Sequence, residues 1–197
     1  MMRILGIDPG IGICGFGLVE TSGRADFKAL DYGAVTTMVG APMPARIKEL
    51  YESLCLVMKE TKPDVVAIEK LFFAKNVTTG IAVAEARGIV LLVAEQIGAK
   101  VREYTPNEIK KTLTGYGGAN KTQMEEIVRV QLGLKQKPKP DDAADALAAA
   151  ITCGFLYRED EAIMTEKFSN TAGMKRTRRG WEAKAEAEFG DKLDKKA

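Results

Sequence analysis

The chain has 197 residues, 46% of them hydrophobic, and a formal net charge of +2 at pH 7. That is enough apolar material to build the core of one domain of ordinary size. The chain has no histidine, which excludes Ser-His-Asp and Cys-His triads and His-ligated zinc, and leaves carboxylates, lysines and water as catalytic groups.

The three cysteines, Cys14, Cys55 and Cys153, are far apart and form no CxxC pair. Neither a disulfide framework nor a zinc site is indicated, and a reducing cytoplasm fits best. The first apolar stretch contains an aspartate and does not resemble a signal peptide, and the longest apolar run, residues 88–94, is too short to span a bilayer. We therefore expect a cytoplasmic protein without a membrane segment.

The first part of the chain predicts three strands, at residues 3–8, 13–21 and 26–36. Asp8-Pro9-Gly10 supplies the turn after the first strand, and Ser22-Gly23 supplies the turn after the second. Connections as short as these join antiparallel neighbours.

Helices and strands then alternate along the chain. The apolar spacing predicts a helix at 44–62, a strand at 65–69, a helix at 78–97, a strand at 100–104, a short helix from Pro106, a loop at 115–118, a helix at 121–132 and a last helix from 141 to about 157. Strands followed by βαβ units indicate an α/β domain, in which helices flank a five-stranded mixed sheet.

Residues 1–157 are therefore predicted to form one domain. The chain that follows is polar, with a basic run at 175–179 and an end rich in Ala, Glu and Lys. Apolar residues recur at every fourth position from Trp181 to Leu193, so a docked helix is one alternative. The narrow apolar face favours a flexible tail over residues 158–197.

Two carboxylates occupy unusual places in this pattern. Asp8 and Glu69 each end a strand that is apolar enough to be buried, at the edge where open α/β sheets place their sites. Two carboxylates held side by side need a shared proton or a divalent cation, and oxygen ligands in a histidine-free chain favour Mg²⁺ or Mn²⁺.

Two further carboxylates open the last predicted helix. Asp142 and Asp145 are three residues apart, so they share one helix face and can approach the same ion. Either Asp141 or Asp142 could instead cap the helix after Pro140, and we predict that Asp141 is the cap and Asp142 the ligand. Lys and Arg outnumber Asp and Glu between residues 100 and 140, which favours phosphate binding nearby, although such a run can also be a solvated face.

Four segments together carry a family resemblance. They are GIDPG at 6–10, AIEKLFFAKN at 67–76, ARG at 86–88 and DAADALA at 142–148. In this order, within a match that spans residues 3 to about 157, they resemble the RuvC family of Holliday-junction resolvases.

The resemblance implies a ribonuclease H-like fold and a homodimer that cuts two strands of a four-way DNA junction symmetrically, using Mg²⁺, in recombination and repair. It implies that Asp8, Glu69, Asp142 and Asp145 are the catalytic and metal-binding residues. Four carboxylates suffice for two ions, which can serve the attacking and leaving oxygens of a phosphodiester. A branch-migration helicase complex is an expected partner. Some members of the family carry histidine where this chain has Asp142.

Candidate DNA-binding residues follow from composition and from the resemblance. Phe72 and Lys75 belong to a stretch that mixes aromatic and basic residues, which suits stacking on unpaired bases beside a phosphate backbone, although Phe72 could also be core packing. Lys110 and Lys121 match basic positions near DNA in the family. The stretch around Lys121 resembles a phosphate-binding P-loop but lacks its second glycine and follows a helix, so we do not expect ATP binding there.

The predicted helix at 78–97 is apolar almost all round, so it needs cover either from the chain itself or from a second subunit, and the resemblance favours the second subunit. Two rival functions remain. One is a catalytically silent junction-binding protein on the same fold. The other is an actin-like or sugar-kinase ATPase that uses Asp8-Pro9-Gly10 as a phosphate loop, although the chain shows no second domain of that kind.

Overall fold

A computed structural model describes residues 1–23, 26–70 and 77–169. The chain divides into two compact units, Met1–Tyr157 and Arg158–Ala197. The candidate site and the sheet belong to the first unit. No helix in the described residues is both long and apolar enough to cross a membrane.

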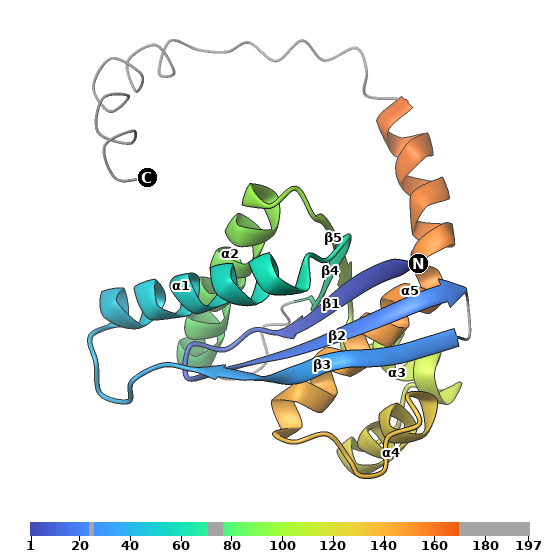
Figure 1. The fold of residues 1–197 in the computed structure, drawn as a ribbon, viewed down its shortest axis with the longest axis horizontal. Coiled ribbons are helices and arrows are strands. Elements are labelled where there is room, and N and C mark those ends of the chain that lie inside the picture. Colours follow the sequence, from blue (N-terminus) through green and yellow to red (C-terminus); the bar gives the residue numbers. More distant parts are fainter. Residues whose placement is uncertain (24–25, 71–76, 170–197) are drawn as a thin grey trace. The chain divides into compact units, whose positions relative to one another are not determined.

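The described residues form five strands and five helices (Figure 1). In chain order these are β1 (Met2–Asp8), β2 (Ile13–Gly23), β3 (Asp26–Thr36), α1 (Met43–Thr61), β4 (Val65–Glu69), α2 (Val77–Gln96), β5 (Lys100–Tyr104), α3 (Pro106–Thr114), α4 (Lys121–Gln131) and α5 (Asp141–Ser169).

The strands form one mixed sheet in the order β3-β2-β1-β4-β5. The first three strands are antiparallel to their chain neighbours, because short turns join them, whereas β4 is parallel to β1 and β5 is parallel to β4, each after a helix. The predicted α/β fold with a five-stranded mixed sheet flanked by helices is confirmed, and it is ribonuclease H-like.

Residues of β1 alternate between two hydrophobic cores, one on each face of the sheet. Ile4 packs in the core that contains residues of α3, α4 and α5, whereas Leu5 and Ile7 pack in the core that contains residues of α1 and α2. Because side chains alternate along a strand, Gly6 and Asp8 lie on the face covered by α5. The strand that reads as one apolar run is therefore buried on both sides.

Helix α5 approaches this face closely because two strands present glycine to it. A Cβ atom at Gly6 would collide with the backbone carbonyl of Ala146, and one at Gly15 would collide with that of Asp142. The helix is correspondingly rich in alanine on its buried side. Small residues on both partners therefore bring the first turns of α5 directly against β1 and β2.

One predicted boundary is wrong. Helix α5 continues to Ser169, well beyond the predicted end near Tyr157. Residues 158–169 contain neither glycine nor proline, and seven of the twelve are Arg, Glu, Ala, Met or Lys, which favour helix even without an apolar face. The apolar pattern alone therefore gave too short a helix.

Candidate active site

Two of the predicted carboxylates are neighbours at one end of the sheet. The parallel pairing of β1 and β4 runs as far as Ile7 and Ile68, and Asp8 and Glu69 are the next residue of each strand. Both lie on the face covered by α5, since Ala67 packs in the same core as Ile4. Strand register alone brings these two carboxylates together.

The other two carboxylates come from the first turns of α5. Gly15 pairs with Asp8 in the ladder between β1 and β2, and the backbone of Asp142 packs on Gly15. Asp145 follows on the same helix face. The structure thus collects four carboxylates from three distant segments of the chain at one end of the sheet.

Burial and mutual repulsion perturb these carboxylates. Burial, with the charges of Asp145, Asp142 and Glu69, raises the pKa of Asp8 to about 7, although the charge of Lys121 partly offsets this rise. Burial and the charge of Asp145 raise the pKa of Glu69. Burial also raises the pKa of Asp145, although Lys121 partly offsets it. A cluster of this kind favours a proton or a cation.

The donor set fits a hard divalent cation, because it offers only carboxylate oxygens. In the described part of the chain, however, no three Asp, Glu or Cys side chains are already gathered closely enough to hold one ion. Asp8, Glu69, Asp142 and Asp145 therefore fit a metal by chemistry and by charge, and their side chains must converge before they share an ion.

Two predicted DNA-binding lysines lie beside the carboxylates. A cavity of about 180 Å³ is lined by Glu69, Asp145, Lys110 and Lys121, with Pro106, Ile109, Met124 and Ala148. Helices α3 and α4 supply the two lysines, and each begins with a capping box, Thr105 with Glu108 in α3 and Asn120 with Gln123 in α4. Carboxylates and cations therefore line one cavity.

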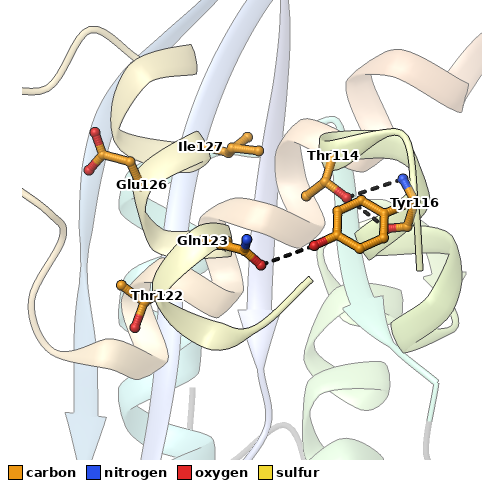
Figure 2. Close-up of a pocket in the computed structure, with 6 residues that line it drawn as sticks. All are labelled: Thr114, Tyr116, Thr122, Gln123, Glu126 and Ile127. Carbon is orange, nitrogen blue, oxygen red and sulfur yellow. Dashed lines mark hydrogen bonds between the residues drawn. The ribbon is translucent and has the colours of Figure 1, made fainter. Parts of the chain in front are cut away.

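The loop between these two helices is fixed by side-chain hydrogen bonds (Figure 2). The Tyr116 hydroxyl donates to Gln123 Oε1 at 3.2 Å, and Thr114 Oγ1 donates to the Tyr116 carbonyl at 2.7 Å. These residues, with Thr122, Glu126 and Ile127, line a second cavity of about 410 Å³ on the surface of the α3–α4 pair. The fixed loop holds α3 and α4, and so Lys110 and Lys121, at a set separation.

The prediction that Asp141 caps α5 is wrong. The helix begins at Asp141 itself, so Pro140 occupies the capping position and Asp141 is the first helical residue. Asp141 instead contacts two lysines: Lys121 Nζ lies 3.4 Å from Oδ2 and Lys139 Nζ lies 3.5 Å from Oδ1.

Sequence reasoning also missed a pair of hydrogen bonds at the turn that follows β1. Thr37 Oγ1 donates to the Ile11 carbonyl at 2.6 Å, and Arg46 Nε donates to Thr37 Oγ1 at 2.9 Å. The hydroxyl is buried and ties the turn after β1 to α1. No pattern in the sequence links these positions, because they meet only through the sheet. The predicted residues Phe72 and Lys75 lie outside the described residues.

The sequence matches the family of crossover junction endodeoxyribonuclease RuvC over residues 4–153. A curated relative, crossover junction endodeoxyribonuclease RuvC from Brevibacillus brevis, is 50% identical over 151 residues, covering 77% of this chain and 90% of the relative. The relative of the same name from Caldicellulosiruptor saccharolyticus is 46% identical over 165 residues, covering 81% and 99%.

A solved structure of similar shape is that of Thermus thermophilus RuvC in complex with a Holliday junction substrate. It is 35% identical, has a TM-score of 0.77 and is matched over 81% of this chain and 97% of that one. Both the sequence and the fold therefore place this chain in the RuvC family of crossover junction endodeoxyribonucleases.

Proposed function

We propose that this chain cuts two strands of a four-way DNA junction symmetrically, with Mg²⁺ held by Asp8, Glu69, Asp142 and Asp145. Holliday-junction resolution and nuclease activity follow from membership of the family. The proposal adds the ion, the residues that hold it and the paired cuts.

A single observation carries this proposal. Four carboxylates from β1, β4 and α5 lie at one end of the sheet, and burial together with three acidic neighbours raises the pKa of Asp8 to about 7. Burial of carboxylates that repel one another costs stability, and a bound divalent cation would relieve that repulsion.

Each group then has a role in phosphodiester hydrolysis. Asp8, Glu69, Asp142 and Asp145 would hold two Mg²⁺ ions, which would supply an activated water and neutralise the charge of the leaving oxygen. Paired strands hold the backbone of Asp8 and Glu69, and a packed helix holds that of Asp142 and Asp145. The backbone is therefore placed in advance, and only the side chains would have to converge on the ion. Mn²⁺, which accepts the same oxygen ligands, should substitute for Mg²⁺.

Lysines supply the affinity for DNA. Lys110 and Lys121 line the same cavity as Glu69 and Asp145, so a phosphate that binds the lysines also meets the carboxylates. We assign Phe72 and Lys75, which follow Glu69 in the sequence, to contacts at the centre of the junction.

A homodimer would supply the second cut. Helix α2 exposes large apolar side chains, with Ile81 54% and Leu92 52% exposed, and Leu56 of α1 is 62% exposed. A second copy of the chain that covers these residues would bury them and would present two active sites to the two strands of a junction. We further propose that the enzyme works in the cytoplasm beside a branch-migration helicase complex. Of the predicted tail at residues 158–197, residues 158–169 belong to α5, so only the remainder is proposed as a flexible tail.

The experiment is cleavage of a synthetic four-way junction and of linear duplex of the same sequence, with Mg²⁺ and with EDTA. We expect paired cuts in the junction alone, and only with the metal. Junction binding without any cleavage in Mg²⁺ or Mn²⁺ would instead indicate the catalytically silent alternative. Equal cleavage of linear duplex would contradict the assignment of the substrate.

A further inference from the structure

We propose that Asp141 is a positioning residue that holds the Lys121 ammonium beside the active site, so that Lys121 pairs with Asp145 in the metal-free protein and stays with Asp141 when Asp145 ligates a cation. This inference rests on the proposed function, because it concerns the same site. It assigns a role to a carboxylate outside the proposed ligand set.

The contacts place one ammonium between two carboxylates of different kinds. Lys121 Nζ lies 3.4 Å from Asp141 Oδ2 and 3.7 Å from Asp145 Oδ2. Asp141 and Asp145 are four residues apart on α5, so they lie one turn apart on the same side of the helix. Asp145 belongs to the proposed ligand set and Asp141 does not. Because Lys121 is close to both carboxylates, a small side-chain movement would shift it from Asp145 to Asp141.

The position of Lys121 in its own helix supports this pairing. Lys121 is the first residue of α4, where the positive end of the helix dipole disfavours a cation. The carboxylates of Asp141 and Asp145, 3.4 Å and 3.7 Å from the Lys121 ammonium, compensate for that unfavourable place. The lysine is therefore held at this helix end by the acidic first turns of α5 and not by its own helix.

Competition with a metal follows from the chemistry of the ligands. The ammonium and a divalent cation both seek the oxygens of Asp145, so binding of one weakens binding of the other. A lysine with no other partner would compete fully. Asp141 gives Lys121 a second partner that is not one of the proposed metal ligands. Lys139 lies 3.5 Å from one oxygen of Asp141, so the other oxygen is left to Lys121. Asp141 thereby keeps the cation of Lys121 near the site while freeing Asp145.

The test is a double-mutant cycle on metal binding. Binding of Mn²⁺ to the full-length, DNA-free protein is measured from the EPR signal of the free ion, for the wild type, Asp141→Asn, Lys121→Met and the double variant. Because all three side chains are about half exposed, we expect Asp141→Asn to weaken Mn²⁺ binding by about two- to fivefold. Lys121→Met should tighten Mn²⁺ binding. In the Lys121→Met background, Asp141→Asn should weaken Mn²⁺ binding much less than it does in the wild type.

Glu125→Gln is the matched control. Glu125 is a carboxylate whose charge also reaches Asp145, but its Oε2 lies 3.1 Å from Lys137 Nζ. Glu125→Gln measures how the loss of a nearby negative charge alone changes Mn²⁺ affinity. This change should be small and should be the same with or without Lys121. An Asp141→Asn penalty that is equally large in both backgrounds would overturn the proposal, because the effect would then be a direct charge effect.

Failure of the proposed function would look different. If Asp8→Asn and Glu69→Gln left Mn²⁺ binding unchanged, the metal site itself would be wrong. The pairing is then judged in metal-free protein at low ionic strength, where Asp141→Asn should lower the melting temperature more in the wild type than in Lys121→Met. Additive effects on the melting temperature would show that Asp141 does not hold Lys121.

Discussion

Asp8 and Gly15 face each other across the antiparallel pairing of β1 and β2, and the absence of a side chain at Gly15 lets the backbone of Asp142 pack there. The distance between the sheet carboxylate and the helix carboxylates is therefore set by a glycine that has no chemical role. Close packing at this point is what assembles the candidate site.

A methyl group at that point should separate the two halves of the site. Gly15→Ala would place Cβ against the Asp142 carbonyl, so we expect a loss of roughly 1–3 kcal/mol in the free energy of unfolding and a larger relative loss of junction cleavage. Thermal unfolding and cleavage rates would be measured together. Gly23→Ala is the control, because its Cβ would meet nothing within 4 Å. Wild-type cleavage by Gly15→Ala would show that this contact does not position Asp142.

Removing one ligand charge should separate cleavage from binding. Asp8→Asn should reduce cleavage in Mg²⁺ by about 10²–10³-fold or more, on the scale of a lost stabiliser of transition-state charge. Junction binding in EDTA should equal or slightly exceed that of the wild type, because an unneutralised carboxylate near phosphate is repulsive. Gel binding and single-turnover cleavage measure the two effects. Near wild-type cleavage, with contaminating nuclease excluded, would end the metal-nuclease assignment.

The raised pKa of Asp8 predicts the pH dependence of stability without metal. The pKa is about 7 in the folded chain and about 3.9 in the unfolded chain, so between these values the folded state binds more protons. The free energy of unfolding should therefore fall as pH rises from 4 to 7, by an upper limit of about 4 kcal/mol from Asp8, at 1.36 kcal/mol per pH unit.

The measurement is thermal unfolding in EDTA from pH 4 to pH 8. Asp8→Asn should be more stable than the wild type at pH 8 and should lose this advantage toward pH 4. Added Mg²⁺ should stabilise the wild type at pH 8 far more than the variant, because ligand binding to the folded state raises its stability. If the stability of both proteins changed with pH in the same way, the raised pKa could not belong to Asp8.

The buried hydroxyl of Thr37 at the turn after β1 should affect both the stability of the fold and the rate of junction cleavage. Thr37→Val removes the donor to the Ile11 carbonyl and the acceptor for Arg46, so we expect a loss of about 1–3 kcal/mol in the free energy of unfolding. Cleavage should slow as the turn after β1 loosens, while junction binding in EDTA stays close to that of the wild type. Thr37→Ser, which keeps the hydroxyl, is the control. A variant that unfolds and cleaves as the wild type does would show that this hydrogen bond is dispensable.

The elements of the fold and the kind of candidate site could be predicted from the sequence. Apolar periodicity and turn residues predicted every strand and helix of the described residues, because local spacing decides which face of an element can be buried. A metal site with oxygen ligands was predicted from the absence of histidine and from the positions of Asp8, Glu69, Asp142 and Asp145. The order of the motifs along the chain predicted the family. The predicted end of α5 was wrong, because residues with high helix propensity can continue a helix after its apolar pattern stops.

Which of these side chains lie near one another depends on how the elements pack. Sheet register makes Asp8 and Glu69 neighbours, and packing of α5 on glycine sets where Asp142 and Asp145 lie. The tertiary structure also turned Asp141 from a predicted cap into a partner of two lysines. Such contacts join positions distant in the sequence, and their geometry depends on how whole elements pack, which no local pattern encodes.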